Sequence, residues 1–194
     1  LVALDTETTS LAYKQAELVG ISLAVKTGEA AYIPLAHRYP GAPDQLNREQ
    51  VLARLKPWLE SAAPKLGHHL KYDAHIFENH GVKLGGIEHD TMLESYVLNS
   101  TATRHDMDSV AALYLGVSTV KYEDVVGKGA KQITFDQVDL DTATRYAAED
   151  ADVTLRLHET LWPQIQAEPG LHDVYTHIER DRKSTRLNSS HITI

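Results

Sequence analysis

The chain has 194 residues, of which 42% are hydrophobic and 24% charged, a composition typical of one globular domain. It has no cysteine, so disulfides, thiol catalysis and cysteine-ligated zinc are excluded. No apolar run reaches the ~18 residues of a membrane span and no secretory signal opens the sequence, so we expect a cytoplasmic location and no membrane partner. The net charge of −8 is unusual for a protein that holds duplex nucleic acid by charge. Either the partner is not nucleic acid, or bound cations or another domain supply the positive charge.

The first third of the chain predicts β-strands. Its apolar runs are short and are bounded by turn-forming residues, as is typical of buried strands. Lys26-Thr27-Gly28-Glu29 forms a turn between the second run and the third. The predicted strands cover residues 1–4, 18–25 and 30–36.

The rest of the chain predicts one further short strand, over residues 65–69, and several helices. Two pairs of residues have the spacing of a capping box, in which a side chain at the helix start bonds the backbone three residues on. These pairs are Asn47 with Gln50 and Thr91 with Glu94. The predicted helices cover residues 47–60 with a break at Pro57, 70–80, 91–99, 106–116, and 140–168 with an interruption near Pro163. Three strands followed by strand–helix alternation predict an α/β fold, with a mixed sheet flanked by helices.

The last 15 residues, 180–194, differ from the rest. They contain four basic residues and one acid, and their pattern has neither a helical nor a strand period. We interpret them as a non-native or disordered tail, a translated cloning or sequencing scar, which ends the domain at residue 179. A natural flexible tail is the alternative. Without this segment, 15 basic residues face 26 acidic ones.

Two acids follow directly from the first apolar strand. Asp5 and Glu7 are two residues apart, and such residues project from the same face of a strand. Carboxylates this close raise each other's pKa unless a cation lies between them. The pair therefore indicates a cation site, with a solvated strand end as the alternative.

A second group of polar residues lies on predicted helices. Tyr146 and Asp150 are four residues apart and share a helix face, beside small alanines that let another element approach closely. Asp73, next to Tyr72, lies in the first turn of its helix, where the helix dipole favours an acid. Taken singly, these residues also fit a half-buried tyrosine and an ordinary acid at a helix start.

Read together, these acids and the tyrosine resemble the DEDD superfamily of 3′→5′ exonucleases, in its tyrosine-containing branch. Longer blocks look like the proofreading domain of bacterial family-A DNA polymerases, over about residues 1–179. The blocks are Asp5-Thr-Glu-Thr, Leu70-Lys-Tyr-Asp73, Asp90-Thr-Met-Leu-Glu-Ser95, Arg104-His-Asp-Met-Asp-Ser109 and Arg145-Tyr-Ala-Ala-Glu-Asp-Ala-Asp-Val-Thr154.

The resemblance implies an RNase H-like fold and two divalent cations, Mg²⁺ or Mn²⁺, with Zn²⁺ as an alternative at one site. It implies that Asp5, Glu7 and Asp150 hold one ion and that Asp5 and Asp73 hold the other. The first ion would lower the pKa of a water that attacks the terminal phosphodiester, and the second would stabilise the departing 3′ oxygen. Glu7 and Tyr146 would orient that water, and the product would be a nucleoside 5′-monophosphate.

The resemblance also implies contacts to the 3′ end of single-stranded DNA. Leu11 stands where the family places an apolar side chain against the terminal base, and Arg104 and Tyr122 match positions that contact the single strand. Tyr72 and His69 belong to the second motif, in which the family carries asparagine where His69 stands. Histidine can bond the terminal sugar but gains a charge as the pH falls, so we expect an altered pH dependence. Ordinary core positions remain the alternative for Leu11 and Tyr122.

Two other functions remain open. One is an RNase D-like enzyme that trims RNA from the 3′ end, and the other is a catalytically inert domain that supports a neighbouring polymerase. The main prediction includes a polymerase region, normally in the same chain, and a bacterial, nucleoid-associated location. The clustered histidines at positions 68, 69, 75 and 80 lack the spacing of known zinc motifs, so they predict no zinc site.

Overall fold

The computed structural model describes residues 1–185, the last seven of them as backbone only. Five strands form one mixed sheet in the order β3-β2-β1-β4-β5. The first three strands pair antiparallel, whereas β4 pairs parallel with both β1 and β5. This architecture confirms the predicted α/β class. The strands are β1 (Val2–Thr8), β2 (Leu18–Lys26), β3 (Glu29–Pro34), β4 (Lys65–Gly67) and β5 (Ile87–Asp90).

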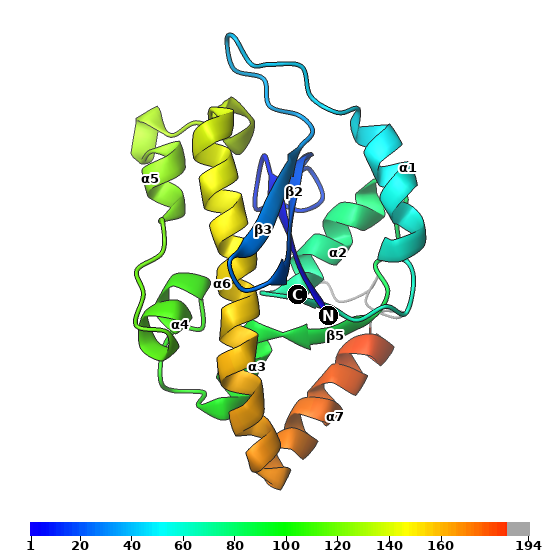
Figure 1. Cartoon of the computed structure of the whole chain (residues 1–194), viewed down its shortest axis with the longest axis vertical. Coiled ribbons are helices and arrows are strands. Elements are labelled where there is room, and N and C mark those ends of the chain that lie inside the picture. Colours follow the sequence, from blue (N-terminus) through cyan, green and yellow to red (C-terminus); the bar gives the residue numbers. More distant parts are fainter. Residues whose placement is uncertain (186–194) are drawn as a thin grey trace, which may run out of the picture.

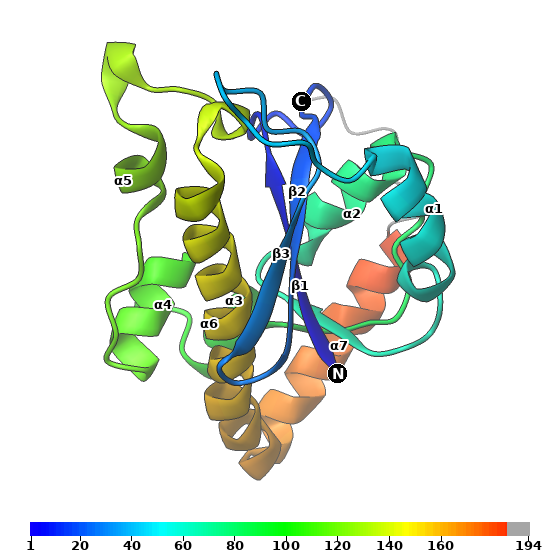
Figure 2. The ribbon, with the colours of Figure 1, turned by 45° about the horizontal axis from the view of Figure 1, so that its top comes forward.

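The helices cover both faces of this sheet (Figure 1). The views of Figures 1 and 2 agree that α1 and α2 lie on one side, that α6 crosses the other, and that α4 and α5 lie outside α6. The helices are α1 (Arg48–Leu59), α2 (Leu70–Asn79), α3 (Thr91–Leu98), α4 (Met107–Tyr114), α5 (Tyr122–Val126), α6 (Leu140–Ala167) and α7 (Pro169–Thr185). Among the described residues, no helix is both long and apolar enough to cross a membrane.

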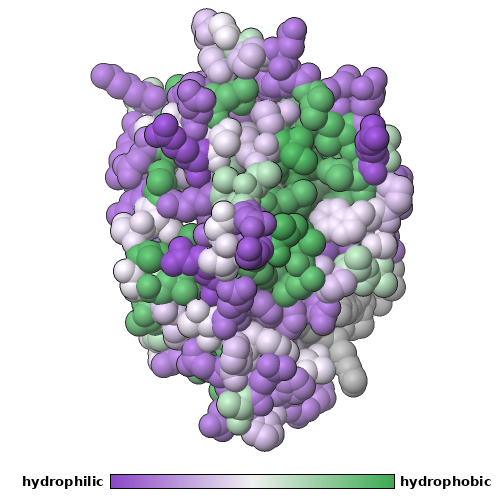
Figure 3. Space-filling model, in the orientation of Figure 1, coloured by the Kyte–Doolittle hydropathy of each residue, from purple (hydrophilic) through white to green (hydrophobic). Residues whose placement is uncertain are grey.

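The two sides of the sheet are packed differently. On the side of α1 and α2, large side chains such as Leu4, Ile21 and Phe77 form the main core. Figure 3 shows hydrophobic side chains gathered between β3 and α1, at the outer edge of this core. On the side of α6, the packing uses small residues such as Ala3 and Ala151, so the helix axis lies close to the strands.

Several predicted boundaries were wrong. The prolines predicted to break α1 and α6 lie inside these helices, at Pro57 and Pro163. In α6 the buried side chains of Leu161 and Ile165 flank Pro163, so packing holds the helix across the lost backbone bond. The second predicted capping box is also wrong, because Asp90 caps α3 and Thr91 is the first, buried residue of that helix.

Five further elements were not predicted. They are the short strand β5, the short helix α5, the 3₁₀ turns Gly129–Lys131 and Phe135–Gln137, and the helix α7. The predicted end of the domain at residue 179 falls within α7, which continues through Thr185. Residues 186–194 of the predicted tail lie outside the described residues.

Candidate active site

Strand β1 directs two acids toward α6. Ala3 is fully buried against α6, and Asp5 and Glu7 follow it on the same face of the strand. The exposed fraction of Glu7 is only 6%. Gly20 faces Glu7 across the β1–β2 pair, and any side chain there would meet the Tyr32 ring, with a Cβ only 2.2 Å from its hydroxyl. The local structure therefore leaves the two carboxylates in a closely packed environment.

Helix α6 supplies the third acid. Its face toward the sheet consists of small residues, Ala143, Ala147 and Ala151, each fully buried. This close packing places the Asp150 carboxylate beside those of β1, and one oxygen each from Asp5, Glu7 and Asp150 lie within 4.8 Å of one another. The alanines near Asp150 thus have the role that the sequence predicted for them.

The fourth acid, Asp73, lies at the start of α2, as predicted. Its Oδ1 accepts hydrogen bonds from the Thr6 backbone N–H at 3.0 Å and from the Thr6 hydroxyl at 2.6 Å. Thr6 lies between the two acids of β1, so this pair of bonds ties the carboxylate of α2 to that strand. The charge on Asp5 raises the pKa of Asp73, after the larger effect of burial, but Asp73 is not among the acids whose oxygens all lie within 4.8 Å of one another.

The backbone that leads into α2 is held by Asp90. Its Oδ1 accepts from the His69 N–H at 3.0 Å, and its Oδ2 accepts from the Leu70 N–H at 2.9 Å. The same carboxylate caps α3 through the N–H groups of Met92 and Leu93. Asp90 therefore fixes the start of the helix that carries Asp73.

Burial and mutual repulsion both raise the pKa values of these acids. Burial, followed by the charge of Asp150, raises the pKa of Asp5 from its ordinary 3.8 to about 8. Burial also raises the pKa of Asp150 to about 8, although a hydrogen bond from the Tyr146 hydroxyl opposes this shift. The pKa of Glu7 is raised well above its ordinary value by burial and by the three other acids. A bound cation would offset the repulsion among these groups.

The residues present fit such a cation. All ligand atoms of the cluster are carboxylate oxygens, which hard divalent ions prefer. Glu7 Oε1 is buried and has no hydrogen-bond partner among the described residues. An ion between these oxygens would coordinate Glu7 Oε1 and would also balance the negative charge of the cluster.

Aromatic side chains border the carboxylates. Tyr146 lies one helical turn before Asp150, and its pKa is raised by burial and by the surrounding acids. The Tyr122 ring packs edge-on against Tyr146, with ring centroids 6.1 Å apart. Tyr32 lies near Glu7, whose charge raises its pKa after the larger effect of burial, and its hydroxyl bonds His37 Nε2 at 2.8 Å.

The predicted substrate residues are not all gathered at this site. The Tyr72 hydroxyl donates to the Ser10 carbonyl oxygen at 2.6 Å, so it holds the loop that carries Leu11. The Leu11 side chain is 89% exposed, and that of Arg104 is 86% exposed and pairs with Asp106. Neither belongs to the core.

The His69 side chain is also exposed, and its backbone adopts a left-handed conformation with φ 65°. Asparagine and histidine are both enriched in this conformation, which explains why either residue fits this position. The His69 N–H bonds Asp90 and Arg104 pairs with Asp106, but among the described residues no hydrogen bond or ion pair joins Leu11, His69 or Arg104 to the four acids of the site.

Sequence reasoning did not identify Thr6, Tyr32 and Asp90 as parts of the site. Strand alternation could have found Thr6, because it must face away from Asp5 and Glu7 and toward α2. The helix-capping preference of aspartate could have found Asp90. Tyr32 carries no such signal, because only the pairing of β2 with β3 brings its ring over Gly20.

Comparison with known proteins identifies the family. A family model described as "3′-5′ exonuclease" matches residues 1–166. The chain belongs to the 3′-5′ exonuclease family. This result confirms the resemblance drawn from the acids and the tyrosine, and the chain is therefore a nuclease by family. Membership in this DEDD-type family implies divalent metal ions, in agreement with the carboxylate cluster.

Curated relatives agree with this assignment. The chain is 59% identical over 182 residues to DNA polymerase I of Pseudomonas aeruginosa, and 44% identical over 198 residues to that of Rhizobium leguminosarum. These alignments cover 92% and 93% of the chain but only 20% and 19% of the relatives. The chain thus spans about a fifth of the length of these polymerases and corresponds to their exonuclease region.

Solved structures show the same fold. Brucella melitensis NrnC matches with a TM-score of 0.67 and 18% identity, covering 99% of this chain and 87% of that one. Escherichia coli RNase D, described as an exoribonuclease, matches with a TM-score of 0.60 and 23% identity, covering 93% of this chain and 44% of that one. These likenesses confirm the predicted RNase H-like fold.

Proposed function

We propose that the chain hydrolyses the terminal phosphodiester at the 3′ end of single-stranded or frayed DNA and releases nucleoside 5′-monophosphates. The observation that carries this proposal is the cluster of Asp5, Glu7 and Asp150, of which Glu7 and Asp150 are buried and Asp5 is partly buried, with oxygens within 4.8 Å of one another. An inert domain has no need of such a cluster, because its mutual repulsion and burial cost folding free energy. The identity to bacterial DNA polymerase I relatives favours DNA over RNA as the substrate.

In this proposal Asp5, Glu7 and Asp150 hold one divalent ion and Asp5 and Asp73 hold another, with Mg²⁺ or Mn²⁺ as the ions and Zn²⁺ as an alternative at one site. When bound, such ions favour ionisation of an attacking water and stabilise negative charge on the departing 3′ oxygen. The chain itself orders the oxygen ligands, because Thr6 fixes Asp73 and the alanines of α6 fix Asp150.

Glu7 and Tyr146 orient the water. Glu7 Oε1 has no partner among the described residues, so it can accept a hydrogen bond from that water. The Tyr146 hydroxyl donates its one proton to Asp150, so its oxygen can accept a hydrogen bond from that water. Leu11, Tyr72, His69, Arg104 and Tyr122 are the proposed contacts to the DNA strand.

The proposed cellular role is proofreading beside a polymerase region. The relatives are about five times longer than this chain, and their printed names describe DNA polymerases. With a net charge of −8, the chain alone should bind DNA weakly, so a further region would supply most of the affinity. The proposed location is the bacterial cytoplasm at the nucleoid.

A digestion assay tests the activity. A 5′-labelled single-stranded DNA is incubated with the protein and Mg²⁺ or Mn²⁺, beside samples that contain EDTA or the matching RNA. The double variant Asp5→Ala/Glu7→Ala removes two ligands, and Asp141→Ala/Glu78→Ala removes two exposed acids as a control of equal charge.

We expect shortening from the 3′ end with the wild type and the control, and none with EDTA or the Asp5/Glu7 variant. Faster shortening of RNA than of DNA would support the RNase D-like alternative instead. Folded wild type that shortens neither strand would contradict the proposal.

A further inference from the structure

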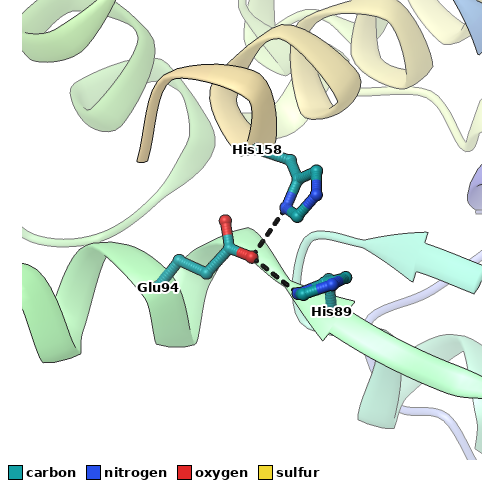
Figure 4. Close-up of side chains that lie close together, drawn as sticks. All are labelled: His89, Glu94 and His158. Atoms are coloured by element: carbon teal, nitrogen blue, oxygen red, sulfur yellow. Dashed lines mark hydrogen bonds and ion pairs between the residues drawn. The ribbon is translucent and has the colours of Figure 1, made fainter. Parts of the chain in front are cut away.

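A second cluster of ligand-type side chains lies where β5, α3 and α6 meet (Figure 4). It consists of His89, Glu94 and His158, with exposed fractions of 7%, 0% and 8%. In the described part of the chain, only this cluster and the carboxylate cluster bring three or more such ligand atoms within 4.8 Å of one another. His158 and Asp150 are eight residues apart on α6, which is ~12 Å along the helix axis, so the two clusters are separate sites.

The two imidazoles converge on one carboxylate oxygen. Glu94 Oε1 lies 2.8 Å from His158 Nδ1 and 3.1 Å from His89 Nδ1, and Figure 4 shows both rings directed at it. The contact to His89 lacks hydrogen-bond geometry, because His89 Nδ1 is buried without a hydrogen-bond partner. Glu94 Oε2 is also buried without one. The hydrogen bond between His158 Nδ1 and Glu94 Oε1 is thus accounted for, whereas hydrogen bonding in the described part of the chain leaves His89 Nδ1 and Glu94 Oε2 buried and unsatisfied.

The distances suit a small metal ion. In tetrahedral coordination with bonds of ~2.0–2.1 Å, neighbouring ligand atoms are roughly 3.3 Å apart. The two distances from Glu94 Oε1 to the imidazole nitrogens would have to increase by only a few tenths of an ångström. Two imidazoles and one carboxylate are donors typical of zinc and related transition metals, whereas Mg²⁺ prefers oxygen ligands alone. Three protein ligands leave a fourth position for water.

Aromatic side chains enclose the cluster. The Trp162 ring lies 4.5 Å from the His89 ring and 6.1 Å from the His158 ring, measured between centroids. Tyr175 of α7 stacks on His89 at 6.1 Å. These rings fix the orientation of His89 and limit the access of water, as expected around a ligand that must stay in place.

We propose that His89, Glu94 and His158 bind a transition-metal ion of the zinc class. This ion would link α6 to β5 and α3 at a site separate from the catalytic carboxylates. The ion would link the edge strand of the sheet to two helices. The site should therefore act on stability, and we expect saturating zinc to raise the Tm by about 5–10 °C.

The test measures binding in a protein whose carboxylate cluster is disabled. Tag-free protein carrying Asp5→Asn/Glu7→Gln is dialysed against Zn²⁺, and the bound metal is counted. Co²⁺ provides a second readout, through its visible absorption and its quenching of Trp162 fluorescence. Added to this background, His89→Phe keeps an aromatic ring against Trp162 but removes a ligand. His75→Phe is the matched control, because His75 stacks on Tyr13 at 4.5 Å outside the cluster.

We expect one tightly bound equivalent in the background protein and in the His75→Phe variant, and its loss in the His89→Phe variant. The thermal stabilisation by Zn²⁺ should be lost with it. Glu94→Gln keeps the side-chain volume and should weaken Zn²⁺ binding at least about tenfold, which provides a second test if His89→Phe does not fold. Equal zinc binding with and without the His89 imidazole, or no tight binding in the folded background protein, would overturn the proposal.

Discussion

Replacing Asp150 by asparagine should stabilise the metal-free protein while it removes catalysis. The pKa of Asp5 and that of Asp150 are both about 8 in the folded chain, because these groups are buried beside other acids. A carboxyl with a raised folded-state pKa favours the folded protein at low pH, and this contribution is lost as the pH rises from 3.8 toward 8. In a chelator, the wild type should therefore be less stable at pH 8 than at pH 5.

The size of the effect follows from the shift. For a single carboxyl, raising the pKa from 3.8 to about 8 costs about 4 kcal/mol of folding free energy at pH 7, since one pKa unit is ~1.36 kcal/mol. Neighbouring carboxyls can share one proton. Removing the charge of Asp150 should therefore recover about half of this folding free energy. Asp150→Asn should raise the free energy of unfolding by about 2 kcal/mol, or the Tm by roughly 4–8 °C.

Urea unfolding in EDTA at several pH values between 5 and 8 measures this gain, which should grow with pH. Asp141→Asn is the control, because Asp141 lies on the same helix but is exposed. With Mg²⁺ present, the wild type should recover stability, and the nuclease rate of Asp150→Asn should be at least about a hundredfold lower. A wild type whose stability in EDTA does not change with pH, or an equal gain for Asp141→Asn, would refute the reasoning.

Other variants test the remaining contacts. His69→Asn should keep the fold and alter the pH–rate profile between about pH 5.5 and 8, so an unchanged profile would contradict the prediction. Tyr122→Ala should weaken single-strand binding by ~1–3 kcal/mol in a fluorescence titration, whereas Tyr122→Phe should not; equal losses would exclude stacking as the cause. Leu11→Ala should leave the Tm within about 1 °C and slow digestion up to roughly tenfold, because the side chain is exposed; a large fall in Tm would show a structural role instead. Asp90→Ala removes the acceptor of four backbone N–H groups and should cost about 2–4 kcal/mol in urea unfolding, and a loss below about 1 kcal/mol would contradict its capping role.

Local sequence patterns predicted most of the framework. The apolar runs that became β1, β2 and β3, and the helix that begins after Asp139, follow from short-range periodicity and capping. Local sequence patterns gave wrong helix boundaries where tertiary packing decides whether a helix continues. Pro163 does not end α6 because buried side chains on both sides hold the helix together.

For the carboxylate site, the sequence placed four of the groups in two local pairs. Asp5 and Glu7 share a face because side chains alternate along a strand, and Tyr146 and Asp150 share one because a helix repeats every 3.6 residues. These relations involve neighbours in the chain, so a single sequence contains them. The resemblance to the exonuclease family then joined the two pairs into one predicted site.

Only the tertiary structure brought together groups that are distant in the chain. Thr6 bonds Asp73 across 67 positions, and His158 meets Glu94 across 64. No local pattern encodes such pairs, because the sheet order and the crossing of α6 determine which side chains face each other. Burial follows from the same packing, and it is burial that raises the pKa values of the acids. The sequence by itself thus determined most of the elements and the four acids with Tyr146, whereas the packing decided which groups meet and how strongly their charges interact.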